Sequence, residues 1–308
     1  MYEGRMFDAM AQIEDSPDTE KFSRMLDNNG IDYMALFSRN RNRWHQRYGD
    51  FYRFAEKIKS DIGNKIVLGT SKRFDQFTDF GDDYIEEVRL QLLEGDRKFI
   101  GELMFSHADK HDGDIHISTE RRVDSASSTV FKMLDMIQQT CPIPVMMHWE
   151  VYHWERDMPD ICNMLNTYPN LTFIWIHCGM AAPWQIDYML SRHSNLVATL
   201  SKREMIRFGD FWISHTFDDL GGYQIANKEW QSNVDGALID NDGIVKPEWH
   251  EIVEKYQDRL MWGTDAHKPL RWQSYGRIVN IWRDILPQFN VDIIKKITYN
   301  NALRVYNV

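Results

Sequence analysis

The sequence predicts a parallel (β/α)8 barrel, a TIM barrel, built as one domain over residues 1–308. Short apolar segments alternate with amphipathic ones along the whole chain, and this alternation occurs eight times. Strict alternation of strands and helices predicts a parallel sheet, and eight repeats predict its closure into a barrel. The alternative is an open doubly wound sheet, but the sequence has no glycine-rich loop after its first expected strand, where that fold usually carries one.

Eight short runs of apolar and β-branched residues are the expected strands. Their brevity indicates burial on both faces, as in a parallel sheet covered by helices. Four of the runs end in a polar side chain, in KFIGE, PVMMHWE, FIWIHCG and RLMWGTD. The expected strands are Arg5–Met10, Ile31–Phe37, Lys65–Gly69, Lys98–Phe105, Ile143–His148, Leu171–Gly179, Leu196–Leu200 and Leu260–Gly263.

The segments between the strands have the apolar spacing and the end signals of helices. Phe22, Met25 and Leu26 share one helical face, and Asn29-Gly30 is a typical helix end. The expected helices are Asp18–Asn29, Trp44–Ile62, Asp82–Leu93, Ser127–Gln139, Met158–Thr167, Trp184–Arg192, Pro247–Tyr256, Arg271–Leu286 and Val291–Tyr306. Residues 106–124 and 201–245 show no such period, so we expect long loops there.

Composition narrows the class of partner. A net charge of −10 and a pI near 5.6 argue against nucleic acid or an anionic membrane surface as the main partner. No apolar run approaches the roughly 18 residues of a membrane-spanning helix, and the first residues lack the form of a signal peptide. The three cysteines have no paired spacing, as in reduced cytosolic proteins. We therefore expect a cytoplasmic protein that acts on a small molecule, with a homo-oligomer as an open alternative.

The polar residues at four strand ends are the candidate site. Glu102, His148, His177 and Asp265 each close an apolar run, and the carboxyl ends of barrel strands face the active-site mouth. Burying several titratable groups together is costly unless a cation or mutual pairing compensates. Imidazole nitrogens and carboxylate oxygens are metal ligands, so the pattern predicts a metal site. The alternatives are histidines satisfied by backbone groups, a Glu102 paired with a lysine or arginine, and an Asp265 that caps the next helix.

Asp265 is also the candidate proton acceptor. A metal lowers the pKa of a bound water toward neutrality, and a neighbouring carboxylate can take the proton. We expect His177 and His267 to take part in the same chemistry. Basic residues follow strands seven and eight, and arginine suits bidentate recognition of a carboxylate, so the substrate is expected to be anionic. The substrate-binding candidates are Lys202, Arg203, Lys268, Arg271 and Glu150, and their alternative is ordinary charge pairing.

The chain resembles the amidohydrolase superfamily, in its amidohydrolase 2 branch, over almost its whole length. The segments that carry the resemblance are FDAMAQIE, FIGELMF, PVMMHWE, FIWIHCG, MWGTDAHK and NNALRVY. The resemblance implies a strand-four acid or modified lysine, histidines on strands five and six, and a strand-eight aspartate around one or two metals. It also implies that a metal-bound hydroxide attacks a carbonyl or related centre.

The first strand departs from the family's pattern. The family has a His-x-His pair there, whereas this chain has Met10 and Gln12. A thioether and a neutral amide are poor replacements for imidazole toward Zn²⁺. We therefore expect one divalent metal, Zn²⁺ before Mn or Fe, held by Glu102, His148 and His177, with Asp265 as a further ligand or the base.

Three functions follow from these expectations. The first is metal-dependent hydrolysis of a C–N or C–O bond. The second is a lyase or decarboxylase on the same scaffold, in which the metal binds the substrate carboxylate as a Lewis acid. The third is a metal-free barrel that binds a ligand without turnover.

Overall fold

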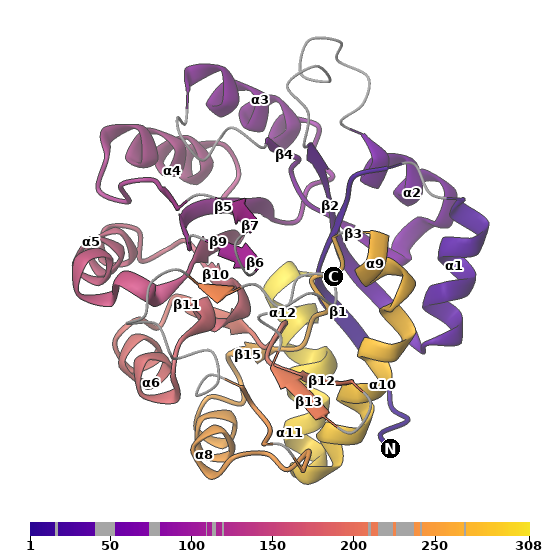
Figure 1. Cartoon of the computed structure of the whole chain (residues 1–308). Helices are drawn as coiled ribbons and strands as arrows, with labels where there is room; N and C mark the ends of the chain where they lie inside the picture. The colour runs from indigo at the N-terminus through magenta and orange to yellow at the C-terminus, as the bar shows by residue number, and fades with distance from the viewer. Residues whose placement is uncertain are drawn as a thin grey trace.

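The structure is a computed structural model, shown along the barrel axis in Figure 1. It describes residues 1–15, 18–40, 53–73, 81–108, 110–112, 115–118, 120–208, 211–214, 224–225, 237–240, 242–267 and 269–308.

Eight parallel strands form the barrel wall. In ring order they are β1 (Met6–Ile13), β2 (Ile31–Asn40), β3 (Ile66–Leu68), β5 (Ile100–His107), β9 (Val145–Trp149), β10 (Phe173–Trp175), β11 (Leu196–Thr199) and β15 (Leu260–Met261). These strands belong to two hydrogen-bonded sheets, with the orders β1-β2-β3 and β15-β11-β10-β9-β5.

Backbone hydrogen bonds connect the two sheets at both seams. At the β3–β5 seam, Lys98 N donates to Leu68 O (2.8 Å). At the β15–β1 seam, Asp265 N donates to Met10 O (2.8 Å), and Gln12 N donates to Ala266 O (2.8 Å). The strands therefore follow one another around a ring, and the expected fold class is confirmed: the chain is an α/β protein with the TIM-barrel arrangement.

Helices cover the outside of the ring (Figure 1). Apolar faces of helices and strands meet in one large core, while a second core of smaller extent fills the inside of the barrel. Capping residues mark the ends of several helices. At the start of α1, for example, the Asp18 side chain accepts hydrogen bonds from Glu20 N and Lys21 N. The outer helices are α1 (Thr19–Asn28), α2 (Phe54–Ile62), α3 (Asp82–Leu93), α4 (Ser128–Thr140), α5 (Trp154–Thr167), α6 (Pro183–Arg192), α8 (Pro247–Lys255) and α10 (Tyr275–Ile285).

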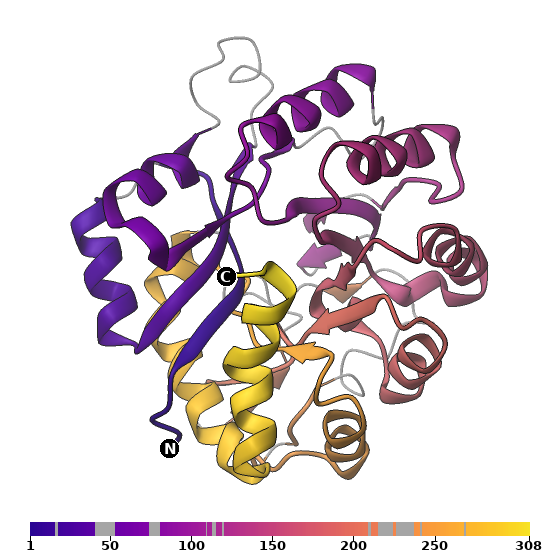
Figure 2. The same ribbon diagram turned by 180° about the vertical axis from the view of Figure 1, so that it is seen from behind.

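The C-terminal helices close the amino-terminal end of the barrel. α11 (Val291–Lys295), a π-helical turn (Lys296–Asn300) and α12 (Asn301–Tyr306) cross this end, as Figure 2 shows from behind. Tyr306 donates its hydroxyl hydrogen to Ala9 O (2.6 Å) and packs in the inner core together with Met10. The fully buried Met10 is therefore part of the packing inside the barrel.

Short hairpins occur where the sequence analysis expected long loops. Residues 106–124 contain β6 (Lys110–Asp112), β7 (Ile115–Ser118) and β8 (Arg121–Arg122), and β8 extends the sheet beside β5. Residues 201–245 contain β12 (Met205–Phe208) paired with β13 (Phe211–Ser214). The two insertions meet, because β14 (Gln224–Ile225) pairs with β6. Both stretches are still long insertions between barrel strands, and the backbone pairing within and between them has no period in the sequence.

Other boundaries also differ from the expected ones. β10 ends at Trp175, and the chain then forms a 3₁₀ turn over Ile176–Met180. The expected helix Arg271–Leu286 is divided into α9 (Pro269–Gln273) and α10. β4 (Lys72–Arg73) extends the third strand's sheet as a partner of β2. Residues 44–52 of the expected second helix lie outside the described residues.

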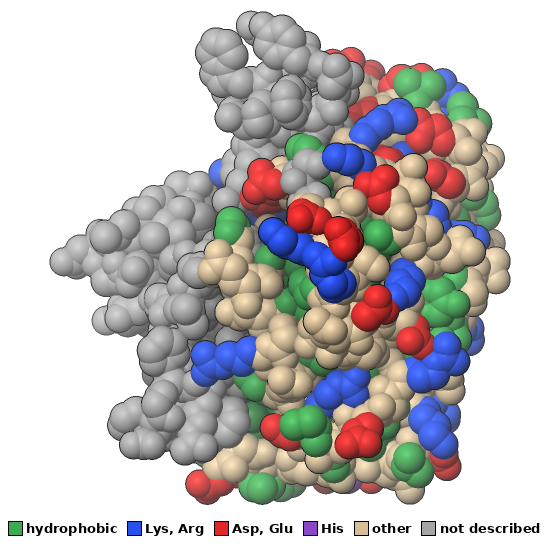
Figure 3. All heavy atoms as spheres, turned by 90° about the vertical axis from the view of Figure 1, so that its right-hand side faces the viewer, with side chains coloured by type: hydrophobic (Ala, Val, Ile, Leu, Met, Phe, Trp, Pro, Cys, Tyr) green, Lys and Arg blue, Asp and Glu red, His purple; other side chains and the backbone are tan. Residues whose placement is uncertain are grey.

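The outer surface has charges of both signs. Figure 3 shows the side formed around α1, α2 and α10, where acidic and basic side chains are interspersed with apolar ones. Ion pairs such as Arg24–Glu20 and Lys65–Asp27 lie in this region. Among the described helices, none combines the length and the apolar character that crossing a membrane requires.

Candidate active site at the mouth of the barrel

The four residues predicted to form the site lie close together at the mouth of the barrel. Glu102 is on β5, His148 is on β9, and His177 and Asp265 follow β10 and β15; all four are buried. The rings of His148 and His177 meet edge to face, with centroids 5.5 Å apart. His148 Nδ1 lies 2.6 Å from Glu102 Oε1, and His177 Nε2 lies 3.5 Å from Asp265 Oδ2.

We call this group and its charged neighbours the mouth cluster. Its β5 half contains Lys72, Glu102, His148 and Glu150, and its β15 half contains Gln12, His177, Lys202, Asp265 and His267.

Left-handed backbone conformations position several of these side chains. His177, Lys202 and Asp265 have φ values of 57°, 60° and 48°, which are uncommon for residues other than glycine. Arg203 stabilises the turn that carries His177: its guanidinium donates to His177 O (2.8 Å) and to Ala181 O (3.0 Å). Such conformations cluster at functional sites, where the surrounding structure holds them.

In the β5 half, each ionisable side chain contacts the next one in the series Lys72, Glu102, His148 and Glu150. Lys72 Nζ lies 2.5 Å from Glu102 Oε2, and Glu102 Oε1 accepts from His148 Nδ1. The other imidazole nitrogen, Nε2, lies 3.1 Å from Glu150 Oε1. Glu150 Oε2 in turn accepts from Ala108 N (2.6 Å).

The pKa shifts follow from this pairing. Burial alone would lower the pKa of His148, but hydrogen bonds to Glu102 and Glu150 raise it above its ordinary value. Burial would raise the pKa of Glu102, but Lys72 and His148 hold it well below its usual range. Burial lowers the pKa of Lys72 to about 8, even though Glu102 opposes the shift. The pairing in this half therefore favours the protonated imidazole of His148, and Lys72 is an ammonium at pH 7.

The β15 half is built around Asp265. Its Oδ1 accepts from Gln12 Nε2 (2.9 Å), and its Oδ2 lies 2.9 Å from Lys202 Nζ and 3.3 Å from His267 Nδ1. Burial would raise the pKa of Asp265, but Lys202, His267 and His177 lower it well below its ordinary value.

His177 differs from His148 in protonation. Burial lowers its pKa well below the ordinary value, and the attraction of Asp265 does not offset that effect. Its Nδ1 lies 2.8 Å from Ser201 Oγ, a neutral partner. At pH 7 the β15 half therefore places a neutral imidazole beside an ionised carboxylate, and the pKa values of both groups are lowered.

A divalent metal does not fit the mouth cluster as these side chains are arranged. Both nitrogens of His148 face carboxylates, so neither lone pair is directed at a metal. Both oxygens of Glu102 are paired with cations, and Lys202 already neutralises Asp265. The three carboxylates Glu102, Glu150 and Asp265 thus already face the basic side chains Lys72, His148 and Lys202. Among the described residues, no group of three or more His, Cys, Asp or Glu is arranged to hold a metal ion.

The predicted substrate-binding residues have different surroundings. Arg203 donates to backbone carbonyls, as described above, and Arg271 donates to Asp265 O (3.1 Å) and lies 3.4 Å from Glu204 Oε1. Both arginines are buried and hold the loops that follow β10 and β15. Lys202 and Glu150 belong to the mouth cluster, and Lys268 lies outside the described residues. Substrate binding by these five side chains remains a prediction.

Two members of the mouth cluster were not among the expected site residues. Lys72 follows β3 in the segment LGTSKR, and Gln12 was noted only as a departure from the family pattern. For Lys72, the available signal was a lysine three residues after the expected strand Lys65–Gly69, together with the considered alternative that Glu102 pairs with a lysine. The structure shows that this pair forms.

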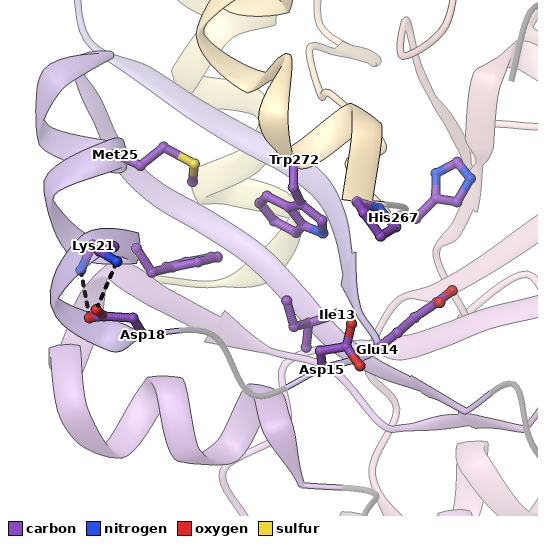
Figure 4. Close-up of a pocket in the computed structure, with 10 residues that line it drawn as sticks. Ile13, Glu14, Asp15, Asp18, Lys21, Met25, His267 and Trp272 are labelled. Carbon is purple, nitrogen blue, oxygen red and sulfur yellow. Dashed lines mark hydrogen bonds and ion pairs between the residues drawn. The ribbon is translucent and has the colours of Figure 1, made fainter. Parts of the chain in front are cut away.

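A cavity of about 440 Å³ lies beside the β15 half, between α1 and α9. Figure 4 shows Trp272 and Met25 on one side and Ile13, Glu14 and Asp15 on the other, with His267 at the edge. The lining is mostly apolar and includes Phe22 of α1. Because His267 also contacts Asp265, this cavity adjoins the mouth cluster.

A parallel barrel with buried acids and imidazoles at its mouth defines the class of TIM-barrel enzymes. Within that class, the chain belongs to the amidohydrolase family, whose model matches residues 142–308. This membership supports a hydrolase-type enzyme acting on a small molecule. A comparison with curated protein sequences finds no match.

Solved structures of similar fold agree with the barrel. One is a candidate 2-pyrone-4,6-dicarboxylic acid hydrolase from Pseudomonas putida, with a TM-score of 0.59, 12% identity, and coverage of 98% of this chain and 97% of that one. An uncharacterized TIM-barrel protein from Bordetella bronchiseptica has a TM-score of 0.54 at 12% identity, covering 94% and 82%. A dihydroorotase from Campylobacter jejuni has a TM-score of 0.53 at 12% identity, covering 99% and 83%. At this identity the likeness concerns the fold.

Proposed function

We propose that the protein hydrolyses a C–O or C–N bond of a small anionic substrate, with Asp265 as the proton acceptor. The observation that carries the proposal is the buried, ionised Asp265 carboxylate, which Gln12 and Lys202 hold beside the neutral His177. Family membership supports the hydrolytic class, and the preference for an acidic substrate rests on the basic residues that follow β11 and β15 in the sequence.

In this reaction, a water oxygen attacks the carbonyl carbon of an ester, lactone or amide. The water's proton goes to Asp265, and the carbonyl oxygen takes up the negative charge. When the adduct collapses, the C–O or C–N bond breaks, and the leaving group takes the proton back from Asp265. His267 and Lys202 keep the carboxylate oriented and ionised, and His177 is the second group that can exchange a proton with it.

A substrate panel tests the proposal. Lactones, esters and amides with a carboxylate are compared with their uncharged counterparts, using wild type and Asp265→Asn. We expect faster hydrolysis of the anionic members and its loss in Asp265→Asn. The matched control is Asp187→Asn, because Asp187 is an outer carboxylate on α6 that pairs with Lys255 and Tyr256. Release of CO₂ from aromatic acids, without hydrolysis of any panel member, would support the lyase alternative and refute the proposal.

Metal dependence is a second candidate, because the family resemblance implies one divalent metal, Zn²⁺ first, and four candidate ligands gather at the mouth. Binding would require Lys72 to leave Glu102 and a carboxylate to leave His148. Metal analysis of protein purified without chelator, before and after Zn²⁺ is added, tests this. About one equivalent of retained metal would support it, and less than about a tenth would refute it.

A further inference from the structure

We propose that Gln12 holds the attacking water through its side-chain oxygen, Oε1, beside Asp265. This inference rests on the proposed hydrolysis and adds a residue to it. Gln12 lies near the end of β1, where its backbone N donates to Ala266 O (2.8 Å), and only 3% of its surface is exposed. Its position is therefore fixed on the β15 side of the barrel mouth.

The orientation of the Gln12 amide follows from its partner. An ionised carboxylate can only accept hydrogen bonds, so the NH₂ group must face Asp265 Oδ1, which lies 2.9 Å from Nε2. The flipped amide would place two acceptor oxygens against each other. Oε1 is therefore directed away from Asp265 Oδ1 but remains on the same amide group, close to the carboxylate.

Gln12 Oε1 has no hydrogen-bond donor within the part of the chain that the structure describes, and it is buried. Buried polar atoms in folded proteins are almost always paired, and an unpaired one destabilises the fold. A donor that is not among the described residues, such as a bound water, would resolve this conflict. The position is also the one where the family resemblance predicts a histidine, and an amide oxygen is a neutral hydrogen-bond acceptor rather than a strong metal ligand.

Water is the donor that fits both neighbours. It has two O–H groups, so one can be donated to Gln12 Oε1 and the other to the Asp265 carboxylate. Its oxygen lone pair then remains available to attack the carbonyl carbon. As the new C–O bond forms, the O–H bond toward Asp265 breaks and the proton moves to the carboxylate, while the other hydrogen stays on the adduct. Gln12 is thus a positioning group for the nucleophile.

A high-resolution crystal structure of the wild-type protein tests the water site without any substrate. We expect one ordered water within hydrogen-bond distance of both Gln12 Oε1 and Asp265, and its loss in Gln12→Met, which has similar length and no amide. A protein donor on Oε1, or no water between the two groups, would overturn the inference.

Kinetics with the best anionic lactone or ester of the panel distinguish the role of the Gln12 donor, Nε2, from that of its acceptor, Oε1. Gln12→Met removes both the donor and the acceptor, whereas Gln12→Lys keeps a donor for Asp265 and lacks the acceptor. We expect both variants to lower kcat by about 10- to 100-fold with KM nearly unchanged. Gln288→Met is the matched control, since the Gln288 amide binds Val245 N and Gly243 O outside the mouth cluster.

The outcomes distinguish this inference from the proposed function. Wild-type kcat in Gln12→Lys would show that only the Nε2 bond matters, and an increase in KM alone would show that Oε1 binds substrate; either result refutes the water site. If the bridging water is present but no panel member is hydrolysed, the proposed function fails and the water site stands.

Discussion

His148 and His177 lie side by side at the mouth, yet the two halves of the mouth cluster give them different charge states. In the β5 half, carboxylates face both nitrogens of His148 and raise its pKa. In the β15 half, His177 has a hydroxyl on one nitrogen and a carboxylate 3.5 Å from the other, and its pKa falls. The comparison teaches that the partners of a buried imidazole, rather than its place on a barrel strand, decide whether its pKa rises or falls.

The halves also differ in how completely their polar atoms are paired. Both Glu102 oxygens and both His148 nitrogens have charged partners, whereas Gln12 Oε1 in the β15 half has no donor among the described residues. A fully paired network rigidifies a site, and an unpaired acceptor marks the place where an outside group can bind. This difference is consistent with the proposed chemistry in the β15 half and with a supporting role of the β5 half at the barrel mouth.

The largest expected effect is that of Asp265→Asn on turnover. Removing the charge removes the proton acceptor, so kcat should fall by about a thousandfold, within the usual range for general bases. Circular dichroism and thermal unfolding should show that the variant is folded. A variant that keeps more than a tenth of wild-type kcat would place the chemistry outside the β15 half.

Lys72→Met should act mainly on stability. It leaves the Glu102 carboxylate buried without its ammonium partner, and breaking such a pair costs about 3–5 kcal/mol in the free energy of unfolding. Urea denaturation at neutral pH measures this cost. The control Lys65→Met breaks the more exposed pair with Asp27 and should cost at most about 1 kcal/mol. Equal costs would mean that Lys72 does not neutralise Glu102.

Lys202→Met should shift the pH dependence of the reaction. Lys202 helps to hold the pKa of Asp265 below its ordinary value, so its removal raises that pKa. A base must be deprotonated, and the acid limb of the pH profile of kcat/KM should therefore move to higher pH. We expect a loss of about tenfold on the acid side and a smaller one at higher pH. An unshifted acid limb would exclude Asp265 as the base.

His148→Gln should give the smallest effect, a pH-dependent change in stability. The folded-state pKa of His148 is raised, so its pairing stabilises the protein fully below the unfolded pKa of about 6.5 and progressively less as pH rises through the folded pKa. The difference in unfolding free energy between wild type and variant should therefore shrink as the pH rises above the unfolded pKa of about 6.5. Denaturant titrations at several pH values measure it. A difference that grows with pH would contradict an imidazolium in the β5 half.

The sequence predicted the barrel well because alternation of apolar runs and amphipathic helices is a local property. Asp82–Leu93 was predicted with the observed bounds, and Glu102, His148 and Asp265 were recognisable as polar residues that follow apolar runs, although β5 continues past Glu102 to His107. The pairing of β14 with β6 was not predictable, because it joins segments far apart in the chain that have no period.

The sequence by itself determined which side chains stand at the carboxyl ends of the strands, since apolar runs and their polar ends are written in order along the chain. Only the tertiary structure decided what those side chains are next to. Lys72 comes from the segment after β3 and Lys202 from the one after β11, yet they neutralise acids on β5 and after β15. Charge states in a buried cluster depend on distances of a few ångströms between such segments, and no local pattern encodes those distances.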